Sequence, residues 1–229
     1  MSLYAIGDLH LSLGSDKPMD VFGGGWENYL EKIKEGFSRL DSGDLCVLCG
    51  DTSWAMSMEE SFDDFMFIES LPGKKLILKG NHDYWWTTVA KMKAFFQKHS
   101  IESVDIVHNN CFFYEGAAIC GTRGWMTEGE ADTEQNVKIM VREASRLRAS
   151  LAAAGGAEEK LCFFHYPPRY NNAVCKDIIN VMNEFNVSKC WYGHIHSHGR
   201  RFAVQGAVEG IDYKLISADY VNFTPQRIM

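Results

Sequence analysis

The sequence lacks a segment that could cross a membrane, because none of its apolar runs reaches the roughly 18 residues that a spanning helix needs. Residues 1–7 contain neither a basic segment nor a long apolar one, so we expect no signal peptide. The seven cysteines are an odd number and mostly lie in apolar runs, which is typical of reduced thiols in a protein core. These features predict a cytoplasmic protein without a membrane partner.

A dense run of basic residues is also missing. The chain has 23 Lys and Arg against 30 Asp and Glu, and its formal net charge is −7. A long nucleic acid requires several phosphate contacts, so this balance argues against a nucleic-acid partner, although a local basic cleft is compatible with it. Hydrophobic residues make up 46% of the chain, which is enough for a substantial core and excludes wholesale disorder.

The sequence contains one Cys-x-x-Cys pair but no second pair that could complete a structural zinc site. Cys46 and Cys49 lie in an apolar run that ends at Gly50-Asp51, whereas a redox pair would need a turn or a helix N-terminus. We therefore interpret both cysteines as buried strand residues.

Short apolar runs alternate with longer segments whose apolar residues recur every three or four positions, which is typical of a layered α/β fold. The expected strands are residues 3–6, 45–48, 75–78, 105–107, 112–115, 117–120, 161–164, 189–192, 202–204 and 213–217. The expected helices are residues 26–40, 58–70, 87–99, 133–153 and 173–185. We predict one domain over residues 1–229, with a helical cap or insertion around 121–156 as an open alternative to an ordinary solvated helix.

Five apolar runs are each followed at once by residues that can bind a metal. These clusters are Asp8-Leu9-His10, Gly50-Asp51, Gly80-Asn81-His82-Asp83, His165, and Gly193-His194-Ile195-His196. A single Gly-Asp or Gly-His is usually ordinary turn chemistry, but five clusters in this position are hard to explain independently. Open α/β sheets place their sites at the carboxyl ends of strands, so we expect the clusters to meet.

The chemistry of these clusters indicates a centre with two metal ions. Carboxylate oxygen together with imidazole nitrogen suits manganese, iron or zinc, and we expect manganese to support activity in vitro. Asp8 and His10 are two residues apart and would project to the same side of an extended strand. Two metals about 3.5–4 Å apart would clamp a phosphoryl group and generate a hydroxide nucleophile.

The order of these motifs from Asp8 to His196 resembles the calcineurin-like metallophosphoesterases, and in particular their small bacterial-type phosphohydrolases. The resemblance implies a four-layer α/β/β/α sandwich with mixed sheets and a two-metal centre at the strand ends. It implies that Asp8, His10 and His196 hold one metal. It implies that Asn81, His165 and His194 hold the second metal, and that Asp51 binds both. It also implies that His82 contacts the phosphate and protonates the leaving group, and that Asp83 orients the His82 imidazole.

The sequence departs from the protein phosphatases of this superfamily, because Gly50-Asp51 is not followed by their Asp-Arg pair. This loss removes an arginine that grips a phosphoryl group, so we expect a small soluble phosphoester, with a diester somewhat favoured over a monoester. Candidate substrate contacts are Trp54, Trp86 and Trp125, which could stack on an aromatic group, and Arg123, which could bind phosphate. Packing beneath the loops and surface solvation are the alternatives for these residues.

Two other functions stay open. A non-catalytic metal-bound scaffold of the same fold would tolerate loss of ligands or of His82, whereas this sequence keeps the full set. A nuclease would require more basic surface than the composition supplies. An oligomer is also open, since the apolar face of the 133–153 helix could pack on its own core or on a second subunit.

Overall fold

A computed structural model describes residues 1–17, 19–126 and 133–229; residues 127–132, part of the segment 121–156, lie outside the described residues. The strands are β1 (Leu3–Ile6), β2 (Leu45–Leu48), β3 (Lys74–Ile77), β4 (Val104–Ile106), β5 (Phe112–Tyr114), β6 (Ala117–Thr122), β7 (Glu159–Phe164), β8 (Arg169–Tyr170), β9 (Ala173–Val174), β10 (Lys189–Tyr192), β11 (Gly206–Val208), β12 (Ile211–Leu215) and β13 (Gln226–Arg227). The α-helices are α1 (Tyr29–Phe37), α2 (Phe62–Ser70), α3 (Val89–Lys98), α4 (Glu134–Ala153) and α5 (Lys176–Glu184).

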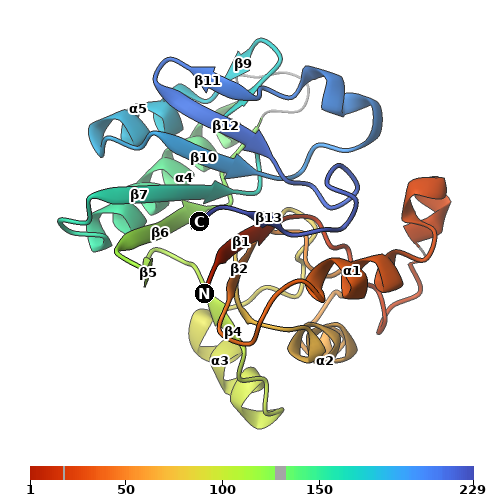
Figure 1. Ribbon diagram of the computed structural model, residues 1–229. Coiled ribbons are helices and arrows are strands. Elements are labelled where there is room, and N and C mark those ends of the chain that lie inside the picture. The colour runs from red at the N-terminus through yellow and green to blue at the C-terminus, as the bar shows by residue number, and fades with distance from the viewer. Residues whose placement is uncertain (18, 127–132) are drawn as a thin grey trace.

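Two sheets lie against each other in the centre of the molecule (Figure 1). The strand order is β13-β1-β2-β3-β4 in the first sheet and β11-β12-β10-β7-β6-β5 in the second. The inner strands are parallel, whereas β13, β11 and β5 pair with their neighbours in antiparallel fashion. Both sheets are therefore mixed. The central parallel strands also end level with one another, because Ile6 pairs with Leu48 and Leu48 with Ile77.

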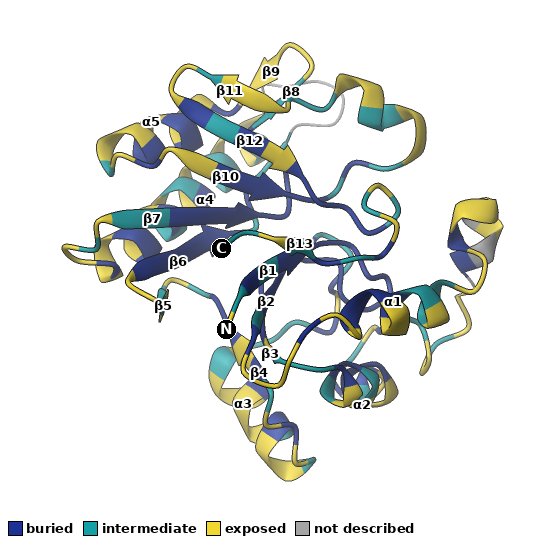
Figure 2. Ribbon diagram, in the orientation of Figure 1, coloured by how far each residue is buried: buried dark blue, intermediate teal, exposed yellow. Residues whose placement is uncertain are grey.

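The side chains of the strands bury into three apolar layers. The outer face of the first sheet packs under α1, α2 and α3, and that of the second sheet under α4 and α5. Between the sheets lies a third cluster, in which Val47 and Leu76 meet Phe163 and Trp191. Figure 2 shows this pattern as buried strands flanked by helices with exposed outer sides. The predicted four-layer α/β/β/α sandwich is confirmed.

Helix α4, which lies within the predicted segment 121–156, belongs to the outer layer of the second sheet. Its Leu147 and Leu151 are fully buried in the cluster shared with α5. Val137 and Val141 lie on its exposed side, with 44% and 54% of their surface accessible. The interpretation of residues 1–229 as one domain stays a prediction.

The predicted strand at 202–204 is wrong, because Phe202 ends a 3-10 helix and the strand β11 begins only at Gly206. The tight turn at Glu209-Gly210 explains the shift: both residues have positive φ, 50° and 85°, and this two-residue loop sets the register of β11 against β12. The helix predicted from residue 173 begins at Lys176, because Ala173–Val174 forms the short strand β9.

Candidate metal centre

The five polar clusters meet at the carboxyl edge of the two sheets, as the sequence predicted. Two close approaches hold this edge together, and both depend on glycine. A Cβ atom on Gly193 would lie 2.4 Å from Oδ2 of Asp8, and one on Gly80 would lie 2.1 Å from the backbone nitrogen of Asp51. No other residue fits at either position without moving a candidate metal ligand.

The candidate ligands leave their strands in an unusual backbone conformation. Asp8, His10, Asp51 and His194 all have positive φ, at 60°, 48°, 49° and 69°. The interpretation of Asp8 and His10 as neighbours on an extended strand is therefore wrong, although both side chains do reach the same group. Left-handed backbone is disfavoured for residues with a Cβ, and such strain concentrates at functional sites because the surrounding structure imposes it.

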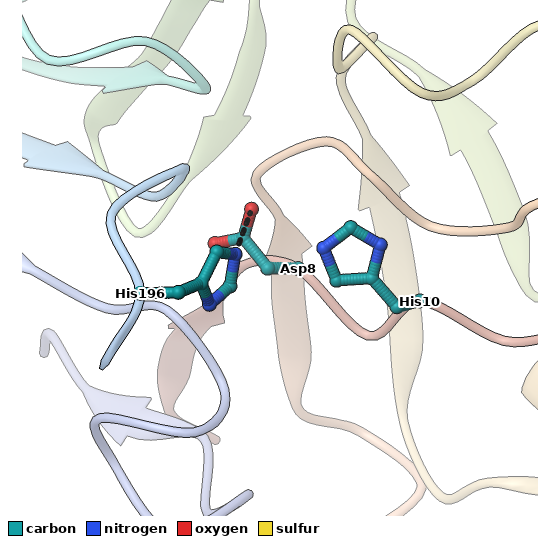
Figure 3. Close-up of side chains that lie close together, drawn as sticks. All are labelled: Asp8, His10 and His196. Carbon is teal, nitrogen blue, oxygen red and sulfur yellow. Dashed lines mark ion pairs between the residues drawn. The ribbon is translucent and has the colours of Figure 1, made fainter. Parts of the chain in front are cut away.

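The first group of ligand atoms comes from Asp8, His10 and His196, and these atoms lie within 4.8 Å of one another. Figure 3 shows the Asp8 carboxylate next to the His196 imidazole, which comes from a separate loop, and the His10 imidazole on the other side of Asp8. Nε2 of His196 lies 3.7 Å from Oδ1 of Asp8. The resemblance predicted this same set for one metal.

The second group comes from Asp51, His165 and His194, again within 4.8 Å of one another. Asn81 joins it, because its Oδ1 lies 2.5 Å from Nε2 of His165. Oδ2 of Asp51 lies 3.5 Å from Nε2 of His165 and 3.8 Å from Nε2 of His10. Asp51 thus stands between the two groups, the position that a bridging ligand requires.

The buried imidazoles are suited to metal binding. Burial lowers the pKa of His10 to about 3 and that of His165 well below its usual value, so both rings are neutral near pH 7. Nδ1 of His10 and Nε2 of His196 are buried without a hydrogen-bond partner among the described residues. The neutral ring of His10 offers the lone pair of its free nitrogen to a further ligand. For His196, burial is outweighed by hydrogen bonds to Asp219 and Asp8, which raise the pKa of the ring to about 10, so a metal ion bound there would displace a proton.

The two central carboxylates supply the negative charge. Asp8 and Asp51 are 0% and 1% exposed. Burial, with Asp83 and Asp8 nearby, raises the pKa of Asp51, whereas three histidines hold the pKa of Asp8 below its usual value despite its burial. Two facing carboxylates repel each other, and cations between them would remove this cost. The donor set therefore fits two metal ions.

Two of the histidines are oriented by oxygen atoms that accept a hydrogen bond from Nδ1, the ring nitrogen that faces away from the ligand group. Nδ1 of His165 lies 3.2 Å from the carbonyl oxygen of Cys49, and Nδ1 of His196 lies 2.8 Å from Oδ1 of Asp219. Such partners fix the ring for metal binding. The sequence analysis missed Asp219, although it follows β12 just as the other clusters follow their strands.

His82 lies beside the centre, with its ring centroid 5.9 Å from that of His10. The prediction that Asp83 orients His82 is wrong, because Nδ1 of His82 has no hydrogen-bond partner among the described residues. Asp83 instead accepts from the backbone nitrogens of Gly80, Thr52 and Ser53 and from the indole of Trp85. Asp83 therefore ties the loop after β2 to the loop after β3.

An apolar pocket of about 300 Å³ opens beside the first group of ligands. Its lining consists of His10, Met19, Trp26, Trp54, His82, His196 and Ser197. The indole of Trp54 stacks on His10 with centroids 5.0 Å apart and lies 4.2 Å from the ring of His82. Trp26, which the sequence analysis did not single out, also lines this pocket, with its ring centroid 5.9 Å from that of His196.

The other predicted substrate contacts lie elsewhere. Trp86 packs against Trp85 and is not part of this pocket's lining; it borders a separate hollow over α3. Trp125 lies on the far side of the centre, where it contacts the ring of Tyr166 and the guanidinium of Arg123. Of the four residues, the structure brings only Trp54 into the pocket.

A four-layer sandwich with two groups of metal ligands at its strand ends defines a class of metal-dependent phosphoesterase. The sequence matches the calcineurin-like phosphoesterase family over residues 1–198, and the chain belongs to that family. No curated relative matches the chain at a significant level. Within the described residues, no helix is both long and apolar enough to cross a membrane.

Two solved structures share the fold over nearly the whole chain. The phosphopantetheinyl hydrolase PptH from Mycobacterium tuberculosis has a TM-score of 0.57 at 14% identity, covering 100% of this chain and 95% of the other. The protein of unknown function AQ665 from Aquifex aeolicus has a TM-score of 0.52 at 14% identity, covering 99% and 95%. At this identity the likeness concerns the fold.

We predict that Asp51→Asn lowers metal occupancy below two equivalents, because it removes the charge shared between the two groups. Metal analysis of the purified variant checks this. Asp63→Asn, which changes an exposed carboxylate in the first turn of α2, is the matched control and should bind as the parent does. Two full equivalents in Asp51→Asn would contradict the bridging role.

We predict that Asp219→Ala weakens the binding of one of the two ions by about 10–100-fold, because the His196 ring loses its orienting partner. Titration with Mn²⁺ should show that the affinity for the second ion is little changed, and thermal unfolding should show that the melting temperature is little changed. Asp219→Asn keeps an acceptor and should lose less. A uniform loss of both ions, or a drop in stability alone, would assign Asp219 a structural role instead.

Proposed function

We propose that the protein hydrolyses a small soluble phosphoester, with a diester somewhat favoured over a monoester, using two ions of manganese, iron or zinc. The observation that carries the proposal is the position of Asp51, whose Oδ2 lies within 4 Å of a histidine from each ligand group. We infer that manganese supports the reaction in vitro.

Seven side chains would hold the ions, in the two groups described above and with Asp51 between them: Asp8, His10, Asp51, Asn81, His165, His194 and His196. When bound, two such ions neutralise phosphoryl charge and lower the pKa of a water that attacks phosphorus. The protein's contribution is to hold the donors rigidly, which the left-handed backbone at four of these residues reflects.

His82 is the proposed proton donor to the leaving oxygen. Its backbone nitrogen donates to Oδ1 of Asp51 at 2.8 Å, which fixes the residue beside the bridging position. Burial, with His194 and Lys17 nearby, lowers the pKa of the His82 ring to about 4. An arriving phosphoryl anion favours the charged ring and so raises this pKa toward a value useful for proton transfer.

The pocket between Trp54 and Trp26 supports a substrate with an apolar or aromatic substituent. A diester carries a second substituent that can fill this pocket, whereas a compact monoester dianion gains little from apolar surface. Because one structure of similar fold is named as a phosphopantetheinyl hydrolase, a phosphopantetheinyl ester belongs in a substrate panel beside nucleotide and phosphosugar esters.

We predict that His82→Ala keeps both metals while turnover falls by about 10²–10⁴-fold, the usual scale for a positioned acid. The loss should shrink for a nitrophenyl ester, whose leaving group departs without a proton. His198→Ala, which changes an exposed histidine, should leave both rates unchanged. An equal loss for good and poor leaving groups would point to charge stabilisation alone.

We predict that Trp54→Ala raises KM for thymidine 5′-(p-nitrophenyl phosphate) by about 5–100-fold, because a stacked ring is worth about 1–3 kcal/mol. KM for methyl p-nitrophenyl phosphate, which has the same leaving group, should rise much less. Phe113→Ala removes an aromatic ring that is 61% exposed on β5 and serves as the control. An unchanged KM in folded Trp54→Ala would return Trp54 to a packing role.

A further inference from the structure

A group of basic side chains lies at the same edge as the metal centre but belongs to neither ligand group. This cation cluster consists of Lys79, Arg123 and Arg146, each from a different segment of the chain. The ring of His108 lies beside the cluster, and burial and the nearby Arg146 lower its pKa, so it adds a neutral imidazole. Ile77 of β3 pairs with Ile106 of β4, so Lys79 and His108 leave neighbouring strands at the same level. Lys79 precedes the candidate ligand Asn81 by two residues.

The second sheet adds the two arginines to this place. Thr122 of β6 pairs with Phe164 of β7, so Arg123 leaves its strand beside His165. The two sheets touch here, since a Cβ atom on Gly121 would lie 2.7 Å from the side chain of Leu78. The cation cluster therefore continues the edge beyond the second ligand group, on the side away from the apolar pocket.

The positive charge of the cluster is only partly balanced. Glu143 is fully buried, and its Oε1 lies 2.7 Å from Nη1 of Arg146 and 3.6 Å from Nη2 of Arg123. Its other oxygen accepts from the hydroxyl of Thr122 at 2.6 Å. One carboxylate thus serves two guanidinium groups, while the Lys79 side chain makes no hydrogen bond or ion pair with the described residues.

The surroundings of Lys79 and Arg123 also leave donors unused. Lys79 is half-buried, and Asp83, the other acid beside it, is already bonded to three backbone nitrogens and an indole. The Arg123 side chain is 15% exposed, and its Nε is buried without a hydrogen-bond partner among the described residues. Half-buried cations with unused donors are stabilised by an anion that accepts from them.

We propose that the cation cluster binds a second anionic group of the substrate, a second phosphate, while the metal centre holds the phosphoester that is cleaved. This inference rests on the proposed function and names the substrate class more narrowly. The substrate has an apolar or aromatic part at the Trp54 end and a phosphate at the Lys79 end. The cleaved phosphoester lies between them.

The test uses p-nitrophenyl alkyl phosphates whose alkyl chain ends in either a hydroxyl or a phosphate, in a graded series of chain lengths. Nitrophenol release reports cleavage of the diester only. We expect the terminal phosphate to lower KM by about tenfold or more at the best chain length, as a charge-assisted contact would. Equal KM values at every length, with measurable hydrolysis, would overturn the second subsite and leave the hydrolase standing.

Variants assign the effect to the cluster. In Lys79→Gln the ratio of the two KM values should fall toward one, and Arg123→Gln provides a second variant should the first fail to fold. Lys74→Gln removes an exposed lysine at the other end of β3 and should keep the ratio. A ratio that persists in both cluster variants would also overturn the proposal.

Binding measurements separate this proposal from the proposed function. Calorimetry with the Mn²⁺-loaded protein compares an alkanediol bisphosphate with the alkyl monophosphate of the same length. If neither of the p-nitrophenyl alkyl phosphates is hydrolysed, the proposed hydrolase function fails. The second subsite is still supported in that case if the protein binds the bisphosphate more tightly than the monophosphate and Lys79→Gln abolishes this preference. The absence of any preference overturns the subsite.

Discussion

The burial of two carboxylates, Asp8 and Asp51, is the constraint on which the rest of the site depends, because each needs hydrogen-bond donors and cations around it. Asp8 accepts from the backbone nitrogen of His194 at 3.0 Å and 2.9 Å through its two oxygens, and Asp51 accepts from that of His82 at 2.8 Å. Each carboxylate thus holds the loop that carries other functional side chains. Because neither can keep its charge in an apolar interior without partners, the loops, the histidines and the cations depend on one another.

The price of this arrangement is local strain. Four candidate ligands adopt a left-handed backbone conformation. Gly80 and Gly193 have no side chain, which allows the carboxylates of Asp51 and Asp8 to lie close to the backbone there. The four packed layers make such strain tolerable, since the sheets around it are pinned by three separate apolar clusters. The strained functional residues therefore lie at the strand ends, where the regular hydrogen bonding of the sheets stops and the packed layers beneath hold the backbone in place.

The two ends of the site differ in chemical character, one being aromatic and the other basic. Aromatic side chains gather beside β1 and β10, where Trp26 and Trp54 line a pocket, whereas basic side chains gather beside β3 and β6. The net charge of −7 conceals this local cationic region, because charge distribution and not total charge decides what a cleft attracts. A substrate bound across the metals would contact both ends.

Much of the architecture could be read from the local sequence. Strands and helices follow the periodicity of apolar residues, and the candidate ligands follow their strands by one to four positions, so short-range patterns were sufficient to find them. The same reading failed for residues 202–204, where a two-residue turn sets the register, and for the backbone at Asp8 and His10, which is left-handed rather than extended.

Other features depend on contacts between residues far apart in the chain. Asp219 meets His196 across 23 positions, Asp83 bonds to Thr52 across 31, and the cation cluster assembles from three segments. No spacing in the sequence marks such pairs. The kinds of ligand were therefore decided by local sequence, whereas the partners of each ligand, the walls of the pocket and the place of the cations were decided by how the two sheets pack.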